Sequence, residues 1–345
     1  MNEKRLKEWL SSRKRVRETR TPDLLFEAIR KGDRTALSGA ITLLESTREK
    51  DQETAKELIR RCLPFSGNAI RIGITGVPGV GKSSFIEKFG KTVLESRKKV
   101  AVLAIDPSSE RTGGSILGDK TRMETLSQNE RVFIRPSAAG NTLGGVARKT
   151  RETIILCEAA GFDVILIETV GVGQSEIMVH SMVDFFLLLL LAGAGDELQG
   201  IKRGIMEMAD GLAVTKSDGD NVQKAKLASR ELKNAIHLFP PTSNGWIPEV
   251  KTCSSLQETG VDEVWEMIER FERHTKLNGS FDAKRKHQDL NWMHETLKDL
   301  LLQGLWFQDK MRDFIEAKEA EVENGNSSAF QAAEEIYRLY RNINQ

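Results

Sequence analysis

One glycine-rich segment of the sequence has the residue types and the spacing of a phosphate-binding loop. The pattern G-x-x-x-x-G-K-[ST] is met by Gly76, Val77, Pro78, Gly79, Val80, Gly81, Lys82 and Ser83, with Ser84 next. The glycines let backbone N–H groups turn towards a phosphate, and a following helix N-terminus adds a positive dipole. Lys82 is suited to the β- and γ-phosphates, and the Ser83 hydroxyl to Mg²⁺. The segment predicts a nucleoside triphosphate site.

Two carboxylates are expected beside this loop because each follows an apolar strand. Asp106 ends the run 99–105, and Glu168 ends the run 164–167. An acidic residue at such a position commonly holds Mg²⁺ or its water molecules. Without the loop, it would more often be an ordinary surface carboxylate. Glu168 also begins a segment that ends in Gly171 and is similar to the GTPase segment whose glycine N–H senses the γ-phosphate.

The segment 107–122 is rich in glycine and hydroxyl residues and has no periodicity. NTPases keep their first switch loop at this place, and such loops become ordered around the γ-phosphate and Mg²⁺. Asp119 is therefore a candidate for a further carboxylate near the metal. The alternative interpretation is a mobile surface loop that binds no ligand.

The base is predicted from the segment Thr215-Lys216-Ser217-Asp218, which approximates the N-K-x-D motif of GTPases with Thr in place of Asn. The Asp218 carboxylate can accept hydrogen bonds from N1–H and the N2 amino group of guanine. Adenine lacks this donor pair and would leave the carboxylate unpaired. Ser254, Ser255 and Leu256 lie where GTPases place a backbone contact to guanine O6. The alternative, a polar strand-to-helix loop, stays open, but GTP is preferred.

No catalytic base is evident in the sequence. Gln174 follows the second switch segment, and the candidates for charge stabilisation are Arg111, Arg122 and Arg148. Nothing in the sequence fixes any of them at the γ-phosphate. We therefore expect slow intrinsic hydrolysis that a partner accelerates.

From residue 70 onward the chain alternates between apolar strands and helices. That order predicts a mainly parallel sheet covered by helices. The expected strands cover residues 70–75, 99–105, 132–134, 164–167, 185–191, 211–214 and 250–252. The carboxyl edge of such a sheet is where ligands bind. The predicted fold class is an α/β P-loop NTPase with an N-terminal helical segment and a C-terminal helical arm.

We expect residues 1–65 to form the helical segment, 66–277 the nucleotide-binding domain and 278–345 the arm. In the arm, apolar residues recur at alternating spacings of three and four from Leu290 to Phe314, which indicates a heptad stripe. Such a stripe must be buried, either against its own domain or against a second subunit. We favour a homodimer.

The composition excludes several other classes of protein. Among 345 residues, 51 Lys and Arg balance 50 Asp and Glu, so the net charge gives no case for nucleic-acid binding. The longest apolar run, 185–194, is too short to span a membrane. Cys62, Cys157 and Cys253 are far apart, which argues against a disulfide framework and a thiolate metal site. We expect a cytoplasmic protein.

Further segments resemble the methylmalonyl-CoA mutase-associated GTPase family, which includes the MeaB and ArgK proteins of bacteria. The resemblance lies in residues 106–109, 112–123, 142–147, 168–176 and 193–210. It is densest between residues 70 and 220. The departures are Thr215 in place of the usual Asn and an arm that matches less closely.

This resemblance implies a GTPase that binds GTP or GDP with Mg²⁺ and acts as a chaperone for an adenosylcobalamin-dependent acyl-CoA mutase. It implies that Lys82 and Ser83 hold phosphate and Mg²⁺, with Asp106, Asp119 and Glu168 around the metal. It also implies that Asp218 reads guanine, that 193–202 is a switch loop linking nucleotide state to the mutase, and that the arm forms a homodimer.

Two other functions are less consistent with the sequence. A small-molecule kinase would need an acceptor pocket with a base near the γ-phosphate, and the sequence indicates none. A metal-delivery GTPase of the nickel type would need clusters of cysteine and histidine, which the sequence lacks. A purely structural role would leave Lys82 without a task.

Overall fold

The computed structural model describes residues 21–105, 123–136, 143–169, 174–192, 203–240, 242–306 and 309–343. The chain forms two compact units, residues 1–285 and 286–345. We call the first the sheet unit, because it contains the strands that the structure describes, and the second the C-terminal unit.

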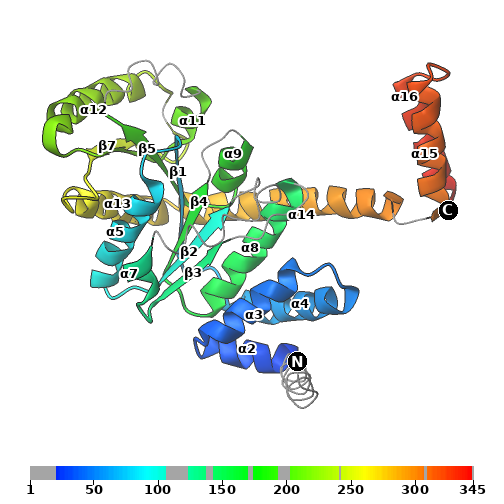
Figure 1. Cartoon of the computed structure of the whole chain (residues 1–345), viewed down its shortest axis with the longest axis horizontal. Helices are drawn as coiled ribbons and strands as arrows, with labels where there is room; N and C mark the ends of the chain where they lie inside the picture. The colour runs from blue at the N-terminus through cyan, green and yellow to red at the C-terminus, as the bar shows by residue number, and fades with distance from the viewer. Residues whose placement is uncertain are drawn as a thin grey trace, which may run out of the picture. The chain divides into compact units, whose positions relative to one another are not determined.

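The sheet unit is built on seven parallel strands in the order β3-β2-β4-β1-β5-β6-β7 (Figure 1). Their bounds are β1 Ile70–Gly76, β2 Val100–Ile105, β3 Val132–Pro136, β4 Val164–Thr169, β5 Phe185–Leu191, β6 Gly211–Thr215 and β7 Glu249–Thr252. The predicted α/β fold with a parallel sheet is confirmed. Because all neighbouring pairs are parallel, the carboxyl ends of all the strands lie at one edge.

Several strands extend one or two residues beyond the predicted bounds, and β4 is one of them. Glu168 was expected to end the apolar run 164–167, and β4 includes it together with Thr169. Glu168 lies opposite Ile74 of β1 and Ala104 of β2. Pairing with both neighbours outweighs the weak intrinsic preference of glutamate for strands. Glu168 is therefore held by a central strand.

Helices surround this sheet: α2, α3 and α4 precede the first strand, and from α5 to α13 the described helices alternate with the strands. Their bounds are α2 Pro22–Arg30, α3 Arg34–Glu45, α4 Glu49–Cys62, α5 Lys82–Glu95, α7 Glu124–Ser127, α8 Leu143–Ala159, α9 Gln174–His180, α11 Arg203–Met208, α12 Val222–Ile236 and α13 Val261–Leu277. In the part of the chain that is described, no helix is both long and apolar enough to cross a membrane.

Strand β5 shows how both faces of the sheet are covered. Phe185, Leu187 and Leu189 belong to a core that includes residues of α5 and α13. Leu188 and Leu190, which point to the other face, belong to a second core with residues of α11 and α12. A continuous apolar strand of this kind is typical of a parallel sheet buried on both faces.

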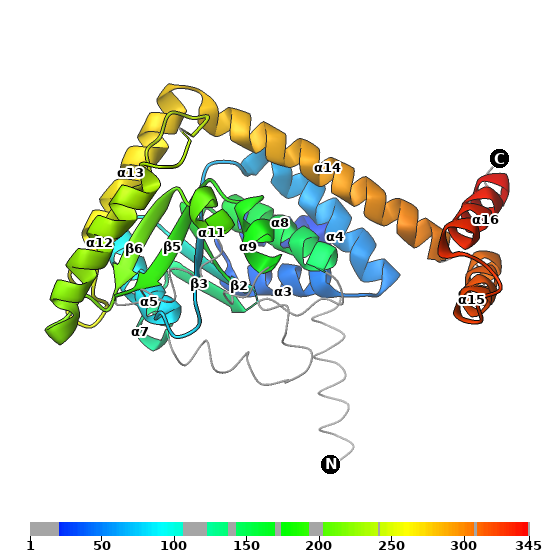
Figure 2. The ribbon, with the colours of Figure 1, turned by 90° about the horizontal axis from the view of Figure 1, so that it is seen from above.

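The N-terminal helices form an additional layer beside α8 (Figures 1 and 2). Helix α2 begins at Pro22, and the hydroxyl of Thr21 accepts a hydrogen bond from the N–H of Leu24 at 3.4 Å. Helix α3 is capped by Asp33, whose Oδ1 accepts from the N–H groups of Thr35 and Ala36. Within the segment expected to be helical, residues 1–65, the described part thus forms helices over residues 22–62.

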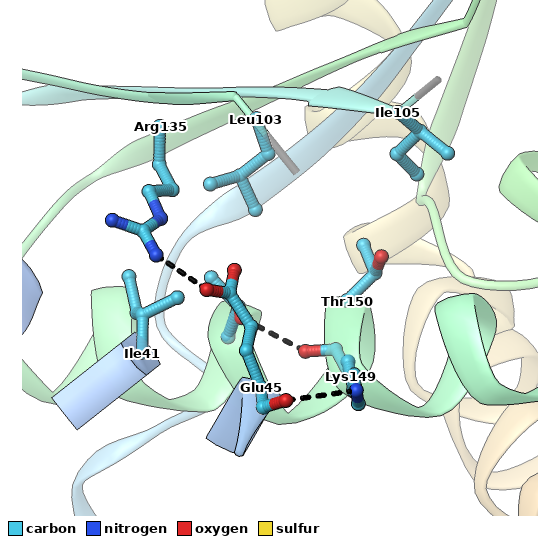
Figure 3. A pocket seen from close by; sticks show the side chains of 8 residues that line it. Ile41, Glu45, Leu103, Ile105, Arg135, Lys149 and Thr150 are labelled. Atoms are coloured by element: carbon cyan, nitrogen blue, oxygen red, sulfur yellow. Dashed lines mark hydrogen bonds and ion pairs between the residues drawn. The ribbon is translucent and has the colours of Figure 1, made fainter. Parts of the chain in front are cut away.

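A polar cluster joins this layer to the sheet around a small cavity (Figure 3). Arg135 at the end of β3 pairs with Glu45, the last residue of α3. Lys149 of α8 donates to the backbone carbonyl of Glu45 at 3.2 Å, which satisfies a helix C-terminus with a cation. The cavity has a volume of about 20 Å³, room for about one water molecule and far too little for a nucleotide.

The first residues of α14 (Ser280–Trp306) form hydrogen bonds and an ion pair with the amino-terminal edge of the sheet. Arg285 donates from Nε to Oδ1 of Asp184 at 2.8 Å and from Nη2 to Oδ2 at 2.6 Å. Lys284 donates to the carbonyl of Asp184 at 2.7 Å. Asp184 is only 2% exposed and lies just before β5. This paired and buried charge fixes the beginning of α14 at the edge opposite the phosphate loop.

The C-terminal unit contains the rest of α14, α15 (Asp309–Glu323) and α16 (Ala329–Ile343). The apolar stripe expected from Leu290 to Phe314 is divided between α14 and α15, since α14 ends at Trp306. Met311 and Ile315 of α15 are buried. The stripe residues on α14 are instead 51–55% exposed, namely Leu290, Met293, Leu297 and Leu300.

Candidate nucleotide-binding site

The phosphate loop connects β1 to α5 in the way that its mechanism requires. Gly76 has φ +155°, and a Cβ there would stand 2.5 Å from the carbonyl oxygen of Leu189. Gly81 has φ +94° and is the N-cap of α5, without a side-chain hydrogen bond to the helix. Glycine is needed at both positions, since a side chain would collide at Gly76 and strain the backbone at Gly81. The first N–H groups of α5 are thus available to an anion.

Lys82 is folded back over this loop. Its Nζ donates to the carbonyl of Gly76 at 2.8 Å and lies 3.4 Å from the carbonyl of Val77. Burial lowers the pKa of the Lys82 ammonium, and the nearby carboxylates of Glu168 and Glu176 oppose that effect. The ammonium is therefore held at the loop by weak neutral partners that a phosphate can replace.

Ser83 and Glu168 come together beneath the loop. The Ser83 hydroxyl donates to Oε1 of Glu168 at 3.2 Å, and Glu168 is 8% exposed. A hydroxyl and a carboxylate are the oxygen ligands that Mg²⁺ prefers, so this pair fits the expected metal. Beside it, the hydroxyl of Thr169 donates to that of Thr75 at 2.9 Å and joins the ends of β4 and β1.

The other expected metal ligands, Asp106 and Asp119, lie outside the described residues. So do Arg111, Arg122, Gly171 and the segment 193–202, and the side chain of Gln174 is likewise not described. Among the described residues no three His, Cys, Asp or Glu side chains form a metal-binding group. Arg148 pairs with Glu152 on the same helix at 3.1 Å.

Glu176 is a carboxylate that sequence reasoning did not select as a site residue. It lies in α9 and is 1% exposed, and its charge acts on Lys82. Its position in a short helix gave no periodic signal that would separate it from a surface acid. The sequence feature that could have identified Glu176 is its position at the end of the segment 168–176, eight residues after Glu168.

Asp218 lies on the same edge of the sheet, beyond the end of β6. The hydroxyl of Ser254 donates to Oδ2 of Asp218 and accepts a hydrogen bond from the N–H of Gln257 at 3.0 Å. Ser254 is completely buried, so this carboxylate is oriented by a rigid partner. The backbone N–H of Ser254 donates to the carbonyl of Thr259. Ser255 and Leu256 are therefore the candidates for a backbone contact to the base.

Thr215 of the motif contacts the phosphate loop directly, and Lys216 lies beside it. The hydroxyl of Thr215 lies 2.7 Å from the carbonyl oxygen of Val80. Lys216 has φ +53°, and its Cε lies 4.0 Å from the position that a Cβ on Gly81 would take. From the sequence, Thr215 was identified only as a departure from the N-K-x-D motif, and this contact was not predicted.

These features define a P-loop nucleoside triphosphatase. The phosphate loop lies at a helix N-terminus, the carboxylate of a central strand lies beside the loop serine, and the sheet is parallel. The family model for "Methylmalonyl Co-A mutase-associated GTPase MeaB" matches residues 37–310, and the chain belongs to this family. The resemblance drawn from the sequence is thereby confirmed.

Relatives with named functions agree with this class. A probable GTPase of Mycobacterium bovis is 51% identical and covers 92% of this chain and 95% of its own length. GTPase ArgK of Escherichia coli is 42% identical, covering 87% and 91%. The mitochondrial methylmalonic aciduria type A homolog of Mus musculus is 42% identical, covering 94% and 81%. The protein is a GTPase.

A solved structure shares the fold over nearly the whole chain. The crystal structure titled "LAO/AO transport system kinase" has a TM-score of 0.73 and is 33% identical in sequence. It covers 93% of this chain and 97% of that one.

Proposed function

We propose that this GTPase is a chaperone for an adenosylcobalamin-dependent acyl-CoA mutase such as methylmalonyl-CoA mutase. In this role it gates the loading of the mutase cofactor and protects the enzyme. The observation that carries the proposal is the match to the mutase-associated GTPase model over residues 37–310. The alignment of Lys82, Ser83, Glu168 and Asp218 along one edge of the sheet supports it, because a GTP-driven step needs these groups together.

In the proposed complex with GTP, Lys82 leaves the carbonyls of Gly76 and Val77 and binds the β- and γ-phosphates. Ser83, Glu168, Asp106 and Asp119 surround Mg²⁺, which neutralises charge on the phosphates when it is bound. Backbone N–H groups of the phosphate loop, from Gly76 to Ser84 except Pro78, which has no N–H, hold the phosphate oxygens. Lys82 stabilises the charge that develops during attack by water, and Asp119 and Glu168 assist as metal-side carboxylates.

We further propose that Asp218 accepts hydrogen bonds from guanine, with Lys216 along the base and Ser254, Ser255 and Leu256 around it. The orientation of Asp218 by Ser254 supports this assignment. We place the protein in the cytoplasm. Its three cysteines, Cys62, Cys157 and Cys253, are buried free thiols, which suits a reducing compartment.

The mutase role is tested by GTP hydrolysis with and without a purified adenosylcobalamin-dependent mutase. We expect the mutase to accelerate phosphate release at least about tenfold, because the described residues alone provide no base or arginine aimed at the γ-phosphate. An unrelated acyl-CoA enzyme serves as the control. Unchanged hydrolysis with every such mutase, and phosphate transfer to a small acceptor instead, would contradict the proposal and favour a kinase.

We also propose that the C-terminal unit pairs with a second copy of the chain. Monomers rarely expose a contiguous apolar stripe, and Leu290, Met293, Leu297 and Leu300 lie at heptad spacing with about half of each side chain exposed. Together with the sequence pattern this supports a homodimer that uses α14.

The dimer is tested by light scattering after size-exclusion chromatography. We expect twice the chain mass of 38.6 kDa, and a monomer when Leu297 and Leu300 are both changed to Glu. Two charges in an apolar interface are costly to bury. Leu238→Glu, at an 83% exposed position in the sheet unit, should leave the mass unchanged. A wild-type monomer at micromolar concentration would refute the dimer.

A further inference from the structure

Two loops that are far apart in the sequence are joined by one buried hydroxyl. Thr215 is the last residue of β6 and is 3% exposed. Its Oγ1 lies 2.7 Å from the carbonyl oxygen of Val80 and 3.2 Å from that of Leu190. A threonine hydroxyl has a single proton, so it donates to one of these carbonyls at a time. The shorter distance assigns that proton to Val80, in the phosphate loop.

The neighbouring residues extend this contact. Val80 is completely buried, and its N–H donates to the carbonyl of Val77 at 3.2 Å. Lys216 follows in the left-handed conformation, and its side chain runs past Gly81. Thr215 thus contacts Val80, and the Lys216 side chain lies beside the next residue of the phosphate loop, Gly81. The backbone just before α5 must be correctly oriented to bind phosphate. It is held by a residue of the segment proposed to bind the guanine base.

From this geometry we infer that Thr215 is a positioning residue for nucleotide binding and does not read the base. The asparagine of the usual motif has two N–H protons, so it can make one contact to the loop and one elsewhere. Thr215 has one proton, and the loop takes it. No proton is left for guanine N7, which is an acceptor.

Base selection therefore falls to Asp218 at the opposite, N1–H and N2, edge of guanine. The inference rests on the proposed role of Asp218 in binding that edge. It adds that residue 215 contributes nothing to affinity through N7, so the ratio of GDP to 7-deaza-GDP affinity is the same with threonine, serine or valine at this position.

The test compares the equilibrium affinities of GDP, 7-deaza-GDP and ADP for the full chain and for two variants. Thr215→Val removes the hydroxyl at nearly constant volume, and Thr215→Ser keeps it. We expect the ratio of GDP to 7-deaza-GDP affinity to be the same in the wild type and in both variants. We expect Thr215→Val to weaken both by the same factor, about 5- to 30-fold, because a buried loop carbonyl loses its donor. Thr215→Ser should restore most of the affinity.

The outcomes separate positioning from the alternatives. Unchanged GDP affinity in Thr215→Val, with only a lower melting temperature of the nucleotide-free protein, would overturn the inference in favour of a purely structural role. Weaker binding of 7-deaza-GDP by the wild type, lost in Thr215→Val, would overturn it in favour of base reading. A third variant, Thr215→Ala, carries the same comparison if the valine variant does not fold. Equal wild-type affinity for GDP and ADP would instead refute the assignment of Asp218.

Discussion

Replacement of Lys82 by alanine is expected to lower the rate of GTP hydrolysis by about 10²- to 10⁴-fold. The Lys82 ammonium lies at the phosphate loop, 2.8 Å from the Gly76 carbonyl, so it needs only a short movement to reach a bound phosphate. The ammonium is also partly removed from water, and this burial lowers its pKa. A charge in such a place stabilises developing negative charge more strongly than one in bulk water.

This expectation is measured as phosphate release in a single turnover, so that binding and chemistry can be separated. The matched control is Lys88→Ala on the same helix, where the side chain pairs with Glu258 rather than with the loop. The control should keep its rate within about twofold, as expected for a surface ion pair. Normal hydrolysis by Lys82→Ala would show that the phosphate loop is not where GTP is cleaved.

Replacement of Asp218 by asparagine is expected to exchange the preferred base. The carboxylate accepts from N1–H and the N2 amino group of guanine, whereas an amide nitrogen in its place would face that amino group donor to donor. Xanthine has a carbonyl at position 2, which accepts from the amide. We expect GDP affinity to fall about 10²- to 10³-fold and xanthosine diphosphate to bind more tightly than GDP.

Competition binding with both nucleotides measures this change. Asp220→Asn is a suitable control, because Asp220 is exposed and lies only two residues further along the chain. Asp218→Asn should fold normally, since the amide can still accept the hydrogen bond from Ser254. If the variant kept the GDP affinity of the wild type, another group would have to read the base.

The sequence predicted the sheet and the phosphate loop because both are encoded locally. Apolar runs define the strands, and the loop's glycines and lysine are adjacent in the chain. Glu168 was predicted at the end of its strand, but which strands lie on either side of it was not predictable in this way. Its place depends on backbone pairing with β1 and β2, which come from other parts of the sequence.

The contacts that orient the site were also hidden from the sequence. Ser254 meets Asp218 across 36 positions, and Thr215 meets Val80 across 135. Comparison with a motif records Thr215 as a mismatch, and only the fold reveals its partner. The roles of Asp106 and Asp119 remain predictions, since both lie outside the described residues.

The central claim is that the carboxyl edge of this sheet binds a guanine nucleotide, and a direct test is a parallel titration of the unaltered protein with GDP and ADP in the presence of Mg²⁺. The account predicts that GDP binds at least about 100-fold more tightly, because only guanine pairs with the Asp218 carboxylate. Equal affinities, or tighter binding of ADP, would contradict it.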